Sequence, residues 1–262
     1  MNNTESNSLL DRIVRAKQAE IKALGPDDVR IPEEIAPALS FRDALKREPG
    51  TAIRVIAECK KASPSMGLMR PEYDPGAIAG SYARLGAAAC SVLTDGEFFQ
   101  GHVDHLRAAR PAGIPLLRKD FTLDVKQIKQ ARAIGADAIL LIVRLLSPTQ
   151  LSEFLSAAEE LGMDALVEIH EEKELDVALE SGARIIGINH RNLDTLAMDL
   201  SLTETLAPRI RSARPDAVVV AESGVESPEG RGRVDAFADA ILIGTAFMQS
   251  SDIDASWRSI FG

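Results

Sequence analysis

Hydrophobic positions along the chain form eight short apolar runs, and the ends of successive runs lie about 26 residues apart on average. The runs are rich in Val, Ile, Leu and Ala, which is typical of parallel strands buried on both faces. The spacing matches the length that one strand, one helix and two loops require. The predicted strands are 52–59, 88–93, 115–118, 138–143, 165–169, 185–188, 217–221 and 240–243.

The segments between these runs carry apolar residues at helical spacing. They predict helices that include 75–85, 125–134, 148–161, 171–181 and 202–211. Gly86, Gly135, Gly162 and Gly182 follow four of them, as expected for left-handed helix ends. Eight such units in succession predict an α/β fold, the closed (β/α)8 TIM barrel.

The first 50 residues precede the barrel and are predicted to form an N-terminal helical extension. A helix over 8–24 is indicated by an apolar face made of Leu9, Leu10, Ile13, Val14, Lys17 and Ile21. Ser40 is placed to cap a second, short helix. We expect one domain over 1–262, with the extension at 1–50 packed against the barrel at 51–262, where it could cover one mouth.

Composition and charge exclude several classes of protein. A net charge of −9 argues against a nucleic-acid surface, but a few lysines can still make a cleft locally positive for a small anionic substrate. No apolar run approaches the roughly 20 residues of a membrane helix. The polar start has no secretory signal, and only two cysteines occur, which favours a reducing compartment. We expect a cytoplasmic monomer with no membrane partner, and a buried, inert Cys59 facing the helices.

Charged residues cluster where the predicted strands end, which is where barrel enzymes place their catalytic groups. The residues expected at this mouth are Glu58, Lys60, Lys119, Glu168, Asn189, Arg191 and Glu222. Buried charges are costly unless they are paired or used, so the pattern favours a catalytic mouth. For Glu58 and Lys60 alone, a structural ion pair explains the pattern equally well.

A phosphate site is predicted after the last two strands, at Ser223-Gly224 and Gly244-Thr245. Barrel enzymes often hold phosphate there with backbone N–H groups. Ordinary turns, which also use Gly and Ser, are the alternative.

Other motifs indicate no cofactor. No Walker motif and no G-x-G-x-x-G follows a strand, and the pair His102 and His105 lacks a third metal ligand. His170 precedes acidic residues at a helix start, and we interpret it as structural.

Six segments follow one another in a recognisable order: IAECKKASPSMG, SVLTDGEFFQG, LLRKDF, LVEIH, GINHRNL and VVAESGV. With them the chain resembles the indole-3-glycerol phosphate synthase family, from LDRIVRAKQAEI to ILIGTAFM. The resemblance implies conversion of 1-(2-carboxyphenylamino)-1-deoxyribulose 5-phosphate, a phosphorylated aminoaryl anion, into indole-3-glycerol phosphate, CO2 and water. It implies neither a metal nor an organic cofactor.

The resemblance also implies roles for the residues at the mouth. Lys119 is the general acid for ring closure, and Glu168 stabilises positive charge or moves a proton. Lys60, beside Glu58, holds phosphate or takes part in dehydration, and Glu222 orients the lysines. Asn189 and Arg191 bind the substrate carboxylate and hydroxyls. The implied phosphate ligands are Ser63, Ser223, Gly224, Gly244 and Thr245. Which lysine performs which proton transfer stays open.

Two positions depart from the family pattern. His190 stands where a second Asn is usual, and its side chain is expected to face away from Asn189 and Arg191. Thr245 stands where an acidic residue is usual, which removes a negative charge near the phosphate. Candidates for an apolar wall around the aromatic ring are Phe121, Leu141 and Leu193.

Two alternatives are kept. A sister barrel such as phosphoribosylanthranilate isomerase would use a Cys–Asp pair at strand ends, but Cys59 is predicted to point outward. A silent barrel serving as a binding subunit would be expected to lack the mouth lysines, and both are present.

Overall fold

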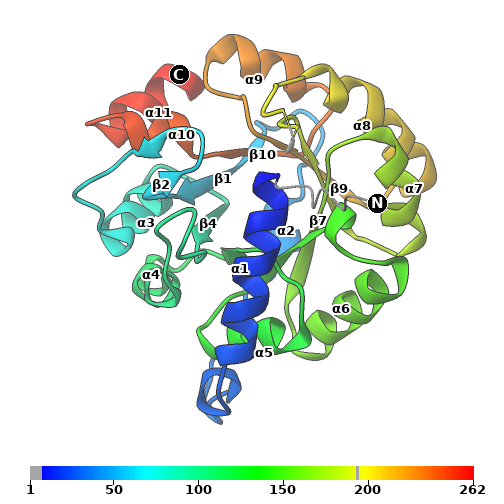
Figure 1. The fold of residues 1–262 in the computed structure, drawn as a ribbon. Coiled ribbons are helices and arrows are strands. Elements are labelled where there is room, and N and C mark those ends of the chain that lie inside the picture. Colours follow the sequence, from blue (N-terminus) through cyan, green and yellow to red (C-terminus); the bar gives the residue numbers. More distant parts are fainter. Residues whose placement is uncertain (1–7, 193–194) are drawn as a thin grey trace.

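Eight parallel strands close into a barrel surrounded by helices in the computed structural model, which describes residues 8–192 and 195–262 (Figure 1). Neighbouring strands follow the chain around the barrel, and β1 closes it by pairing with β4 on one side and β10 on the other. The predicted (β/α)8 barrel and its eight strands are confirmed. Their bounds are β1 Arg54–Cys59, β4 Ala89–Leu93, β5 Leu116–Lys119, β6 Ala138–Ile142, β7 Asp164–Ile169, β8 Ile185–Asn189, β9 Val218–Glu222 and β10 Ala240–Ile243.

Helices alternate with the strands, as predicted. The α-helices are α1 Leu9–Ala23, α2 Phe41–Leu45, α3 Pro75–Arg84, α4 Val103–Ala109, α5 Val125–Ala133, α6 Pro148–Glu160, α7 Glu172–Glu180, α8 Ser201–Ala213, α9 Pro228–Asp235, α10 Thr245–Gln249 and α11 Ile253–Phe261. Short 3-10 helices are η1 Asp27–Val29, η2 Arg110–Ala112 and η3 Val143–Leu145. The loop after β1 also holds a small antiparallel pair, β2 Ala62–Ser63 and β3 Gly67–Leu68. Among the described helices, none is both long and apolar enough to cross a membrane.

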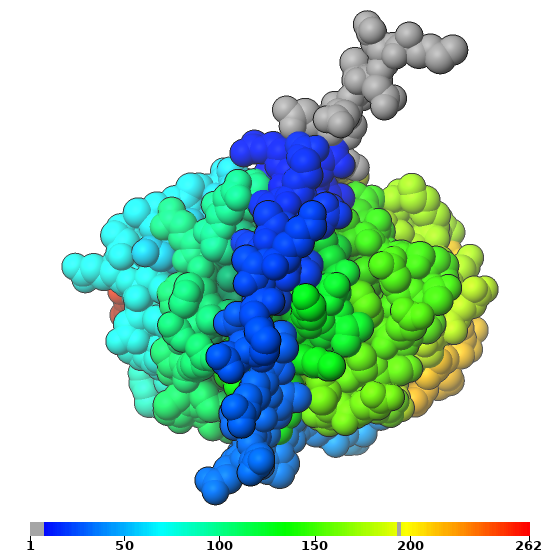
Figure 2. All heavy atoms as spheres, turned by 60° about the horizontal axis from the view of Figure 1, so that its bottom comes forward, coloured from blue at the N-terminus to red at the C-terminus, as the bar shows by residue number. Residues whose placement is uncertain are grey.

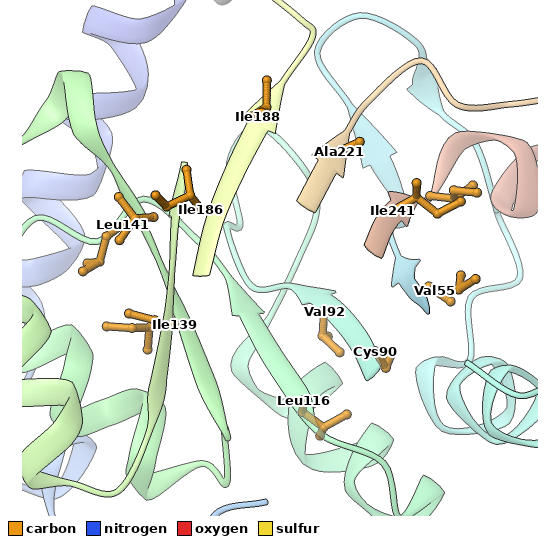
Figure 3. Packing of buried hydrophobic residues seen from close by; sticks show 14 of the residues in the cluster. Val55, Cys90, Val92, Leu116, Ile139, Leu141, Ile186, Ile188, Ala221 and Ile241 are labelled. Atoms are coloured by element: carbon orange, nitrogen blue, oxygen red, sulfur yellow. The ribbon is translucent and has the colours of Figure 1, made fainter. Parts of the chain in front are cut away.

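Strand side chains alternate between two apolar layers. The outer layer lies between the strands and the helices, and Figure 3 shows part of it. It contains Cys59, fully buried with its sulfur 3.6 Å from that of Cys90, so the predicted outward orientation is confirmed. It also contains Leu141, so our prediction that this residue walls the mouth was wrong by one position in the alternation.

The extension closes the amino-terminal end of the barrel with α2. Phe41 and Leu45 are fully buried among the inner-layer residues of the strands. Ser40 caps α2 by accepting a hydrogen bond from the backbone N–H of Asp43, as predicted. Backbone N–H groups of Leu39 and Arg42 donate to carboxylates at strand starts, Asp137 and Asp164 respectively. The sequence pattern did not indicate this plug.

The same extension crosses the opposite end of the barrel with α1, which passes over the carboxyl ends of the strands (Figure 1). Between the two helices the chain descends along the side of the barrel, where η1 packs on α5 (Figure 2). The expectation that the extension packs on the barrel and covers one mouth is therefore confirmed.

Lys17 fastens α1 in place. Its side chain is 1% exposed, and its ammonium lies 3.0 Å from Asp95 and 2.8 Å from Asp120, beyond the ends of β4 and β5. Burial alone would lower the pKa of Lys17, but Asp120 and Asp95 outweigh it and raise the pKa above its usual value. The sequence showed Lys17 only as a member of the helix face, and its position among apolar residues was the signal for burial.

We predict that Lys17→Met destabilises the protein, because it leaves two buried carboxylates without their shared cation. Breaking a buried ion pair from one side costs about 3–5 kcal/mol. Hydrogen exchange should show loss of protection concentrated in α1, together with a lower free energy of unfolding. Lys22→Met on the exposed side of the same helix is the matched control. Equal stability of the two variants would contradict the anchoring role.

Candidate active site

A cavity opens at the carboxyl ends of the strands, beneath α1. Its lining includes every charged or polar residue predicted at the mouth and every predicted phosphate ligand: Glu58, Lys60, Ser63, Lys119, Glu168, Asn189, Arg191, Glu222, Ser223, Gly224, Gly244 and Thr245. They converge because the ends of parallel strands meet at one face of a barrel.

Lys119 lies between two carboxylates. Its ammonium donates to Oε2 of Glu168 at 2.7 Å and to Oε2 of Glu222 at 3.2 Å. The three residues come from β5, β7 and β9, so inward-facing ends of alternate strands supply the cluster. Both carboxylates are almost fully buried, and the cluster is therefore held in a water-poor environment.

One positive charge cannot fully neutralise two buried carboxylates, and their pKa values move apart as a result. Burial would raise the pKa of Glu168, but Lys119 and the neighbouring His170 outweigh it and hold the pKa well below its usual value. Burial also raises the pKa of Glu222, and Glu168 adds to this, so that it reaches about 8 despite Lys119. The ionised form of Glu168 is therefore favoured, whereas Glu222 is displaced towards its protonated form.

Gly187 of β8 makes room for Glu222, and the sequence reasoning missed it. A Cβ atom at this position would collide with Oε1 of Glu222 and approach its Cδ to 3.1 Å. The signal was available, because a glycine inside an apolar strand often marks a close approach. Oε1 of Glu222 has no hydrogen-bond partner among the described residues, which suits an uncharged carboxyl group better than an ionised one.

Lys60 forms a second, separate pair with Glu58. Its ammonium lies 2.7 Å from Oε1 of Glu58, and Ser91 donates to Oε2 of the same carboxylate at 3.4 Å. A Cβ atom at Gly244 would lie 2.6 Å from Oε1 of Glu58, so the glycine lets the end of β10 approach this pair. The sequence explained Gly244 by close approach to phosphate, and the structure adds a second reason, because a Cβ atom there would collide with Glu58.

The side of the cavity after β9 and β10 is lined by unusual backbone. Ser223 and Gly224 both have positive φ, 66° and 76°, and Ser223 is one of few non-glycine residues in this region. Gly244 precedes α10 and supplies no side-chain cap. Backbone N–H groups at a helix start without such a cap can serve an acceptor that enters the cavity.

The segment after β8 alternates as expected. Asn189 lines the cavity and accepts a hydrogen bond from the backbone N–H of Arg191 at 3.0 Å. His190 points the other way, with one ring nitrogen 2.7 Å from the carbonyl oxygen of Ser223 and the other 2.7 Å from the hydroxyl of Thr203. The prediction that His190 faces away from Asn189 and Arg191 is confirmed.

The apolar wall differs from the predicted one. Phe121 lines the cavity as predicted, whereas Leu140 and Ile142 replace Leu141 on β6. Leu193 lies outside the described residues. The wall is completed from above by side chains of α1, namely Leu9, Leu10 and Ile13.

His170, which the sequence analysis interpreted as structural, lies directly behind the cluster. Its Nε2 is 3.1 Å from Oε1 of Glu168, the oxygen that Lys119 leaves free. The signal was the alternation itself, because residues two apart on a strand share a face.

Comparisons with known proteins agree on the family. A family model described as indole-3-glycerol phosphate synthase matches residues 10–260. A relative of that name from Dehalococcoides mccartyi is 48% identical over 83% of this chain and 85% of its own, and one from Leptospira interrogans is 44% identical over the full length of both.

Solved structures support the fold alone. An N-acetylmannosamine-6-phosphate 2-epimerase from Clostridium perfringens aligns with TM-score 0.61 at 16% identity, over 82% of this chain and 93% of its own. A thiamine phosphate pyrophosphorylase from Pyrococcus furiosus aligns with TM-score 0.61 at 14% identity, over 84% and 96%. The family model and the relatives span nearly the whole sequence, and the chain belongs to the indole-3-glycerol phosphate synthase family.

Proposed function

We propose that the cavity converts 1-(2-carboxyphenylamino)-1-deoxyribulose 5-phosphate into indole-3-glycerol phosphate, CO2 and water. The observation that carries this assignment is the cluster of Lys119, Glu168 and Glu222 under an apolar wall, in a chain of this family. Ring closure needs an acid beside the carbonyl oxygen and a negative charge beside the aminoaryl group, and the cluster offers both.

Ring closure forms a bond between the ring carbon that bears the carboxylate and the substrate carbonyl carbon. We assign the proton that the carbonyl oxygen receives to Lys119. Loss of CO2 then returns the bonding electrons to the ring. The new hydroxyl group takes up a proton and leaves as water, and the neighbouring CH2 carbon gives up a proton to a base, so that the double bond of the indole forms. The walls from α1 and Phe121 limit solvent in the cavity while these charges develop.

Glu168 is assigned to stabilising the positive charge that develops on the aminoaryl system. Its low pKa supports this role, because the group stays ionised at neutral pH. Glu222 is assigned to orienting Lys119, whose ammonium donates to it at 3.2 Å. Lys60 is paired with Glu58 instead, and this pair is assigned to dehydration or to the phosphate.

The phosphate is assigned to the side of the cavity formed by Ser63, Ser223, Gly224, Gly244 and Thr245, with Lys60 adding positive charge. The left-handed backbone at Ser223 and Gly224 and the uncapped start of α10 support this assignment. Asn189 and Arg191 are assigned to the substrate carboxylate and hydroxyls.

The enzyme is further proposed to act as a monomer. It is also proposed to be one folding unit, because the extension closes both ends of the barrel. A reducing compartment such as the cytoplasm is proposed with it. Cys59 and Cys90 support that choice as neighbouring free thiols.

The first test concerns the acid. We predict that Lys119→Ala lowers turnover on the order of 10²-fold or more, as for loss of a general acid. Lys119→Arg keeps the positive charge between the carboxylates but is a far weaker acid, so it should remain similarly impaired. Turnover is measured from the fluorescence of the indole product, with circular dichroism to check folding. Substantial activity of the Arg variant would show that Lys119 acts only as a counterion and not as the acid. Wild-type protein that yields no indole product would overturn the proposed function itself.

The second test concerns Glu168. We predict that Glu168→Gln lowers kcat at every pH between about 6 and 9 while KM changes little, because the amide cannot stabilise the positive charge. If the carboxylate only neutralises Lys119, the pH profile should shift instead. Recovery of wild-type kcat anywhere in that range would therefore contradict the catalytic role.

The third test concerns the phosphate. Asn and Asp both tolerate positive φ, so they form a matched pair at position 223. We predict that Ser223→Asp raises KM at least about 10-fold by placing a negative charge beside the phosphate, whereas Ser223→Asn stays close to wild type. Inorganic phosphate should compete with substrate in the wild-type enzyme and lose affinity in the Asp variant. Equal KM values for the two variants would place the phosphate elsewhere.

A further inference from the structure

His170 occupies a fully buried position between two carboxylates from different elements. Its Nε2 lies 3.1 Å from Oε1 of Glu168 on β7, and its Nδ1 lies 3.7 Å from Oε2 of Glu174 on α7. Its backbone N–H also donates to Oε2 of Glu174 at 2.6 Å. The ring is therefore held by α7 and directed at the back of the cluster.

The contacts continue outward as a series of alternating charges. Glu174 accepts from Nε of Arg144 on η3 at 3.0 Å, and Nη2 of Arg144 lies 2.7 Å from Glu171. Lys173 lies 2.9 Å from the same oxygen of Glu171, at the surface. Each buried charge in this series has a neighbour of opposite sign, which lets the series exist inside the protein.

On the cavity side, the two oxygens of Glu168 have different partners. Oε2 accepts from Lys119, which also contacts Glu222, and Oε1 faces His170. His170 itself is not part of the cavity lining. Its effect on a bound substrate must therefore pass through Glu168.

We propose, resting on the proposed function, that His170 is a positioning residue that keeps Glu168 ionised and fixed in orientation while Lys119 gives up its proton. When Lys119 becomes neutral, Glu168 loses the positive charge on Oε2 in a water-poor cavity. A carboxylate in that situation takes up a proton readily. An imidazolium on Oε1 prevents this, and Glu168 remains able to stabilise positive charge on the substrate.

The state of the ring agrees with the geometry. Burial would lower the pKa of His170, but Glu168 and Glu174 outweigh it and raise the pKa to about 9. The pKa of Glu174 is lowered in turn, because contacts with His170 and Arg144 outweigh its burial. At neutral pH the imidazolium thus stands between two ionised carboxylates.

The charge state can be measured without turnover. The chain has four histidines, so nitrogen NMR of labelled protein can follow each ring. We expect both nitrogens of His170 to be protonated at pH 7, while the pKa values of His105 and His190 are lowered by burial. A neutral His170 at pH 7 would overturn the proposal, whatever the enzyme's activity.

The kinetic test uses His170→Gln, which can keep a hydrogen-bond donor near Oε1 of Glu168 but removes the charge. We expect kcat at pH 7 to fall on the order of 10-fold, because the positive charge 3.1 Å from Glu168 is lost, with KM little changed. The acidic limb of the kcat profile should move up by about one pH unit or more, because Glu168 now protonates more easily. Activity should therefore recover in part as the pH is raised.

Two further variants separate this role from packing. Glu174→Gln weakens the hold on the imidazolium and should shift the limb in the same direction, by less. His102→Gln, at an exposed histidine before α4 that does not line the cavity, is the control and should leave kcat and its pH profile unchanged. If the His170→Gln protein is folded and the acidic limb of its kcat profile is unchanged, His170 contributes only to packing and the proposal is wrong. Loss of indole product in the wild type would refute the proposed function, but not the measured charge of His170.

Discussion

One ammonium held between two buried carboxylates is the constraint on which the rest of the active-site architecture depends. The lumen of a barrel is a poor environment for charge, so an excess of one sign has to be relieved locally. Glu222 relieves the excess of negative charge by favouring its protonated form. Glu168 stays ionised because it has a second cationic neighbour, His170, in addition to Lys119. Position 187 on β8 has to be a glycine for steric reasons, because the Glu222 side chain occupies the volume that a Cβ atom of residue 187 would fill.

The N-terminal extension serves the same constraint from outside the strands. Its first helix covers the charged end of the barrel with Leu9, Leu10 and Ile13, and its second helix seals the other end with Phe41 and Leu45. A cavity closed in this way admits less water, and the interactions of its charges are stronger for it. The extension is therefore part of the active site's dielectric environment, although none of its residues carries the proposed chemistry.

The sequence predicted the barrel and the gathering of the charged residues because both follow from periodicity. Strands buried on two faces produce apolar runs, and parallel strands bring their ends together regardless of loop detail. The choice of Leu141 failed because an error of one position in a strand reverses the side that a residue faces.

Other features could not be read from local patterns. The contact of Lys17 with Asp95 and Asp120 joins segments far apart in the chain, and the residues next to Lys17 in the sequence do not indicate these partners. The plug formed by Phe41 and Leu45 depends on a hollow end of the barrel that exists only in three dimensions. His170 was within reach of the alternation rule, but its neighbourhood of acidic residues suggested a helix start instead.

The anchoring of α1 also has a consequence for the order in which the molecule assembles. Lys17 and one of its partners, Asp120, are separated by about a hundred residues in the chain. Phe41 and Leu45 similarly need an inner layer that is complete only when β10 has been made. Contacts between such distant segments form only after a large loss of chain entropy, which favours late formation. The segment that carries Lys17, Phe41 and Leu45 is thus expected to dock on the barrel late in folding.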